Sequence, residues 1–72
     1  MEIFQVPGIF KSNICRAQEL ETNLYEIFKD NNVIGTIFKE DGGWRIEDYK
    51  SESLTAENVQ LIGQQIDKRN RK

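Results

Sequence analysis

Residues 24–49 have the sequence LYEIFKDNNVIGTIFKEDGGWRIEDY, and this stretch decides the fold. Its three runs rich in aromatic and β-branched side chains are typical of strands. Short segments of Asp, Asn and Gly separate these runs, and Asn and Gly tolerate the positive φ angles of tight hairpin turns. The stretch therefore predicts two consecutive β-hairpins.

The first hairpin is predicted to turn at Asn31 and Asn32. Opposed residues share a face of the sheet and neighbours along a strand alternate, so this register fixes the composition of both faces. One face then carries Tyr25, Ile27, Ile34 and Phe38, and the other carries Leu24, Phe28, Val33 and Ile37. Neither face has the polar composition of a surface that lies in water.

The second hairpin ends in an alternating apolar and polar run, and two registers are open for it. A two-residue loop, 41–42, places Trp44 on the face of Ile37. A three-residue loop, 41–43, places Trp44 on the face of Phe38, because a slip of one residue exchanges the faces. In both registers each face carries large apolar side chains. Leaving such a side chain in water forfeits roughly 1.5–3 kcal/mol, so both faces need a cover.

One segment after the hairpins predicts a helix that covers this sheet. Thr55 is the expected N-cap, and Val59, Ile62 and Ile66 recur three and four residues apart, which forms one apolar stripe. Gly63 lies inside this helix, and we expect it to mark a close approach of the helix to the sheet. A single amphipathic helix covers a single face.

The first 23 residues carry the remaining large apolar side chains. Residues 2–6 predict a short strand that ends at Pro7 and Gly8. Residues 14–20 predict either another strand, which we favour, or a short helix opened by Ser12. This segment either extends the sheet or folds across its second face. If it extends the sheet, the second face is free for another chain.

The expected fold is α+β: a small antiparallel β-sheet of three to five strands, with one C-terminal amphipathic helix packed on one face. The 72 residues are expected to form one domain, 1–72, with a short basic tail at 68–72. A chain of this length buries only about 60% of its unfolded surface, so association is a common source of additional stability.

Composition argues against several classes of chemistry. The chain has no histidine and one cysteine, so one copy cannot assemble Ser-His or Cys-His catalytic pairs or the usual zinc ligand sets. We therefore expect no enzyme activity, no metal site and no cofactor.

No targeting signal or membrane span is visible, and the single Cys15 cannot form an internal disulfide. The expected compartment is the cytoplasm.

The surplus apolar face predicts a non-catalytic protein-interaction or regulatory module. Its partner is expected to be another protein chain or a second copy of itself, as a homodimer. The candidate contact residues are Tyr25, Phe38, Trp44, Arg45 and Tyr49.

The alternative is a small nucleic-acid-associated module that contacts phosphates through its basic C-terminal end. The candidate phosphate contacts are Lys68, Arg69, Arg71 and Lys72. The net charge of −2 and the lack of an aromatic platform for bases argue against this alternative.

Overall fold

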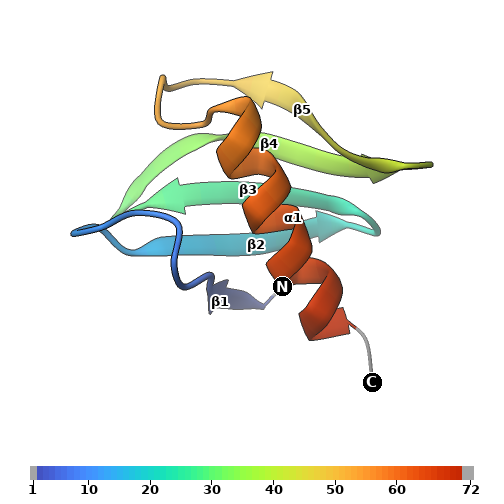
Figure 1. Cartoon of the computed structure of the whole chain (residues 1–72), viewed down its shortest axis with the longest axis horizontal. Helices are drawn as coiled ribbons and strands as arrows, with labels where there is room; N and C mark the ends of the chain where they lie inside the picture. Colours follow the sequence, from blue (N-terminus) through green and yellow to red (C-terminus); the bar gives the residue numbers. More distant parts are fainter. Residues whose placement is uncertain (1, 71–72) are drawn as a thin grey trace.

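Five antiparallel strands lie in the sheet in the same order as in the chain (Figure 1). The structure is a computed structural model and describes residues 2–70. Its elements are β1 (Ile3–Gln5), β2 (Cys15–Glu21), β3 (Leu24–Lys29), β4 (Asn32–Glu40), β5 (Gly43–Tyr49) and α1 (Ala56–Asn70). The helix crosses one side of the sheet (Figure 1), so the predicted α+β fold is confirmed.

The first third of the chain extends the sheet and does not fold across its second face. β1 pairs with β2, and β2 pairs with β3, so the strand alternative for residues 14–20 is confirmed. The connection between β1 and β2 packs Ile9 and Phe10 against the core cluster, which includes Val59, Ile62 and Ile66 of α1. The connection therefore supports the side of the sheet that the helix already covers.

The first hairpin turns one residue earlier than the sequence predicts. Its loop consists of Asp30 and Asn31, not Asn31 and Asn32, and Asp30 adopts a positive φ of 56°. The Asp30 carboxylate accepts hydrogen bonds from the side-chain amide of Asn13 at 2.6 Å and from the backbone N–H of Ile14 at 3.1 Å. These contacts come from the segment before β2, so residue preferences within the hairpin could not reveal them.

A bulge shifts the register again and leaves Ile34 of β4 without an opposed residue on β3. Tyr25 therefore lies opposite Ile37, and Leu24 lies opposite Phe38. The predicted faces of Ile37 and Phe38 were wrong and are exchanged: Ile37 is buried in the core beneath α1, and Phe38 lies on the other face.

The second hairpin adopts the two-residue alternative. Glu40 pairs with Gly43, so residues 41–42 form the loop, in which Gly42 has a φ of 90°. Trp44 consequently lies on the face of Ile37, and it is buried in the core.

The helix begins and packs as the sequence predicts. The Thr55 hydroxyl accepts a hydrogen bond from the backbone N–H of Asn58 at 3.0 Å, which confirms the N-cap. A Cβ atom at Gly63 would overlap the indole ring of Trp44, so the close approach of helix and sheet is also confirmed. The apolar stripe of the helix is fully buried against the sheet, whereas Leu61 at its margin is 38% exposed.

The loop acid Asp30 makes stability depend on pH. The hydrogen bond from the Ile14 N–H, followed by that from Asn13, lowers the pKa of the Asp30 carboxyl from its ordinary value of 3.8. A lowered pKa contributes stability that is present above the unfolded-state pKa and is lost as the pH falls through the folded-state pKa.

We therefore expect the Asp30→Asn variant to lose less stability than the native chain when the pH falls below about 4, the region where a free Asp titrates. Asparagine tolerates the positive φ, so the loop conformation is retained. Urea unfolding between pH 2 and 6 measures the difference. The matched control is Asp41→Asn in the other hairpin loop, because the Asp41 carboxylate accepts no hydrogen bond from residues 2–70. Equal acid sensitivity of Asp30→Asn and the native chain would show that Asp30 has no such role.

Candidate protein-binding face

The side of the sheet turned away from α1 is called the open face. The strand registers place on it Ile3 and Gln5 of β1, Arg16, Gln18 and Glu21 of β2, Leu24, Glu26 and Phe28 of β3, Val33, Thr36 and Phe38 of β4, and Arg45 and Asp48 of β5. No segment of residues 2–70 packs across the open face, because β1 and β2 lie within the sheet and the β1–β2 connection joins the core on the helix side.

The open face has an ordered pattern of apolar and polar residues. Leu24 and Phe38 form an opposed apolar pair near one end of the strands, and Phe28 and Val33 form another near the other end. Between these pairs runs a polar row that crosses four strands. Its members are Gln18, Glu26, Thr36 and Asp48. Thr36 is itself buried, so a partner would meet two apolar ridges with Gln18, Glu26 and Asp48 between them.

The apolar residues of the open face are only partly shielded. Leu24, Phe28, Val33 and Phe38 are all half-buried, whereas their neighbours on the helix side are buried. Neighbouring side chains on the same face therefore remove part of the cost of exposure, and a partner would remove the rest.

The charged groups of the open face differ in how they are paired. Arg45 forms an ion pair with Glu40, and Asp48 lies 3.5 Å from the ammonium group of Lys50. Arg16 donates its Nη1 to the backbone carbonyl of Asp30 at 3.4 Å. The side-chain carboxylate of Glu26 accepts no hydrogen bond and forms no ion pair with any residue of the described part of the chain.

Two of the five candidate contact residues lie on the open face. Phe38 belongs to an apolar pair, and Arg45 lies opposite it on β5. Tyr49 is 58% exposed at the end of the edge strand β5. Tyr25 and Trp44 are 3% and 5% exposed because they pack beneath α1, so a partner cannot reach them unless the helix moves.

Sequence reasoning did not select Leu24, Phe28 and Glu26 as contact residues. The alternation of residues along β3 places Leu24 and Phe28 together on one face. This alternation cannot show on which face the helix packs, because both faces carry large apolar side chains.

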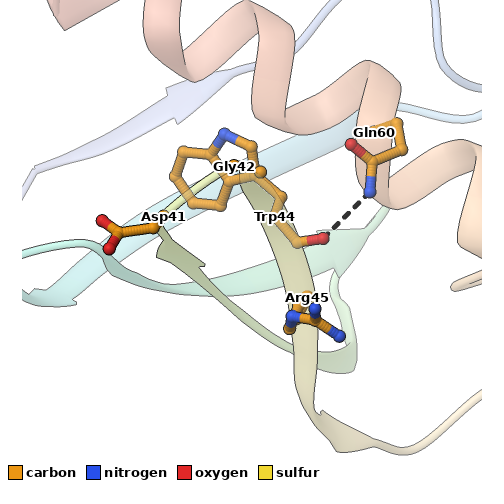
Figure 2. A pocket seen from close by; sticks show the side chains of 6 residues that line it. Asp41, Gly42, Trp44, Arg45 and Gln60 are labelled. Carbon is orange, nitrogen blue, oxygen red and sulfur yellow. Dashed lines mark hydrogen bonds between the residues drawn. The ribbon is translucent and has the colours of Figure 1, made fainter.

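A cavity of about 260 Å³ lies where the β4–β5 loop meets α1 (Figure 2). Figure 2 shows Gln60 reaching from the helix toward Trp44, and its side-chain amide donates to the Trp44 carbonyl at 2.9 Å. Asp41 at the rim points away from Gln60. Trp44 also donates its indole N–H to Asp67 of the helix at 3.3 Å. These hydrogen bonds hold α1 against the edge strand. We therefore assign the cavity to the packing interface between the helix and the sheet.

The candidate phosphate contacts are only partly within the described residues. Arg71 and Lys72 lie outside them. Arg69 forms an ion pair with Glu2 and lies 3.9 Å from the centre of the Phe4 ring, so it ties the helix to the β1 edge. Lys68 is exposed. A phosphate would have to compete with Glu2 for Arg69.

The groups that could support chemistry are few. Burial raises the pKa of the Cys15 thiol to about 11, so it stays protonated near neutral pH and is a poor nucleophile. Within residues 2–70, no three His, Cys, Asp or Glu side chains gather closely enough to hold a metal ion. The same part of the chain contains no helix with the length and apolar character needed to cross a membrane.

The chain matches no family model, no curated protein and no solved structure. The open face is therefore the feature of the molecule from which a function can be inferred.

Proposed function

We propose that this protein is a non-catalytic protein-interaction module that binds another protein chain through the open face. One observation carries this proposal. The first third of the chain extends the sheet, and the connection between β1 and β2 packs on the helix side. Among the described residues, only the helix side of this sheet is therefore covered, although both faces carry apolar side chains. The alternating sequence of β3 and β4 supplies the apolar side chains on both sides.

The size of the open face fits a modest interface. The four longer strands, β2 to β5, lie about 4.8 Å apart and rise about 3.3 Å per residue, so about seven residues of each span roughly 19 Å by 23 Å. Complete coverage would bury on the order of 450 Å² from each partner, or about 900 Å² in total, which is at the low end for protein complexes and common among transient ones. The buried, free Cys15 suits a reducing compartment, so we propose that the module acts in the cytoplasm.

Site-specific photo-crosslinking tests this function. A photoreactive phenylalanine analogue is placed at position 38 on the open face or at position 61 on the outer side of α1, in cells that produce the protein naturally. Both residues are apolar and partly accessible, so the two positions are matched. We expect a discrete crosslinked protein from position 38, lost when Phe28→Ser is added, and none from position 61.

The outcome also reports on the kind of partner. A product at twice the mass of the chain would identify a second copy as the partner. No crosslink from position 38 in a folded, well-expressed chain, or the same product from both positions, would contradict the assignment of the open face.

A further inference from the structure

We propose that the partner of the open face is an amphipathic helix of a different protein, which crosses the strands and presents a lysine or arginine between apolar side chains. Glu26 would receive this cation, and the same carboxylate would disfavour a second copy as the occupant. This inference rests on the proposed function and names the chemistry of the partner.

Glu26 occupies the centre of the open face. It lies on β3, the third of the five strands in the sheet, and its opposed neighbours are Gln18 on β2 and Thr36 on β4. Along β3 its neighbours on the same face are Leu24 and Phe28, two residues away on either side. Any chain that covers the face must therefore cover Glu26.

Covering Glu26 demands a compensating charge. Its side chain is half-buried already, and no cation of residues 2–70 pairs with it. Arg16, diagonal to it across β2, is directed to the Asp30 carbonyl instead. An ionised carboxylate that loses its remaining water without a partner is costly, whereas an Arg or Lys brought by the partner would satisfy it.

A second copy paired about an axis through the centre of the open face cannot supply that charge to Glu26. A symmetric dimer uses the same patch on both subunits, and a two-fold axis through the centre of the open face would place Glu26 against the same residue of the second copy. Two carboxylates buried against each other repel, which opposes symmetric pairing of this face.

The spacing of the apolar ridges fits a helix. Leu24 and Phe28 are four residues apart on one strand, or roughly 13 Å at 3.3 Å per residue, and a helix with its side chains is about 10–12 Å wide. A helix above the polar row would thus rest its flanking apolar side chains on both ridges. Asp48 lies two strands from Glu26, roughly 10 Å away, which corresponds to seven helical residues. A second cation at that spacing would meet Asp48.

Binding of matched synthetic peptides tests the proposed chemistry. The probe is an amphipathic helical peptide of about 18 residues, long enough at 1.5 Å per residue to cross the sheet, with lysine at the centre of its leucine-lined face. The matched peptide has glutamate at that one position. Both are titrated against the isotope-labelled native chain, and chemical shifts report the affinity and the face involved.

We expect the lysine peptide to shift the open-face amides and to bind about tenfold more tightly than the glutamate peptide, as one partly desolvated ion pair allows. Glu26→Gln should reduce this preference to about twofold or less. The matched control is Glu57→Gln on α1, which removes the same charge from the opposite side of the molecule and should keep the full preference.

Self-association gives the second arm of the test. The native chain and Glu57→Leu should remain monomeric in analytical ultracentrifugation at high micromolar concentration, whereas Glu26→Leu should dimerise. Equal affinity for both peptides at the open face would overturn the inference and leave the proposed function intact. A native dimer formed through this face would do the same. If neither peptide shifts the open face, the inference fails, and crosslinking from position 38 decides separately whether the proposed function fails with it.

Discussion

Replacing Gly35 by alanine is expected to remove a large part of the stability of this domain. Gly35 has a φ of 151°, which side-chain-bearing residues rarely adopt, and an added Cβ would overlap both the Asp48 carbonyl oxygen and the side chain of Leu54. Strain at such a φ costs about 1–3 kcal/mol, and overpacking adds about 1–3 kcal/mol. The Asp48 oxygen belongs to the backbone of β5, so it cannot move without disturbing the β4–β5 ladder.

The expected loss of about 2–6 kcal/mol compares with a total stability of about 4–11 kcal/mol for a chain of this length. The shift of the urea unfolding midpoint measures it. Gly8→Ala is the matched control, because Gly8 also has a positive φ, 82°, but an added Cβ there would contact nothing within 4 Å. Equal losses in the two variants would attribute the effect to backbone strain and would contradict the close approach of Gly35 to β5 and Leu54.

Replacing Trp44 by alanine is expected to have the second large effect, about 3–5 kcal/mol of lost stability. The Trp44 ring packs against Gly63 of α1 and lies 5.7 Å, centre to centre, from the ring of Tyr25. Its indole N–H also donates to Asp67. The substitution therefore creates a cavity in the interface between helix and sheet and removes one hydrogen bond across this interface.

A double-mutant cycle isolates the contact between Trp44 and Gly63. Gly63→Ala alone should destabilise the chain, because overpacking at about 1–3 kcal/mol exceeds the gain of about 1 kcal/mol in helix propensity. In the Trp44→Ala background the added methyl group enters the vacated space, so the same change should be neutral or stabilising. Additive effects in thermal or urea unfolding would contradict the contact.

The sequence supported the main architecture because its signals were local. The N-cap at Thr55, the stripe of Val59, Ile62 and Ile66 and the close approach at Gly63 follow from helix periodicity, and the structure confirms each one. The structure also confirms the strand predicted for residues 14–20. That strand decided the central question, because it placed the first third of the chain within the sheet.

The errors arose where contacts distant in the chain decide the geometry. Hydrogen bonds from Asn13 and Ile14 hold Asp30 in the first loop, and the bulge at Ile34 moves the register further. These effects exchange Ile37 and Phe38 between the two faces, and both residues are large and apolar. Hydrophobic patterning cannot distinguish two such neighbours when neither face is polar.

The candidate contact residues were affected by the same ambiguity. Trp44 and Tyr25 are the aromatic residues that sequence reasoning selects first, yet α1 packs on the face that carries them. The acid at the centre of the open face, Glu26, gains its significance only from the order of the strands. Neither the order nor the choice of face can be derived from the composition of a single strand.

Solvent access to the open face can be measured directly by NMR with a soluble paramagnetic agent, which speeds the relaxation of protons that solvent reaches. We expect the ring protons of Phe28 and Phe38 to relax clearly faster than those of Tyr25 and the methyl protons of Ile27 and Ile37. Equal protection of both groups in a monomeric sample would show that the chain covers both faces of its own sheet, which would contradict the proposed binding face.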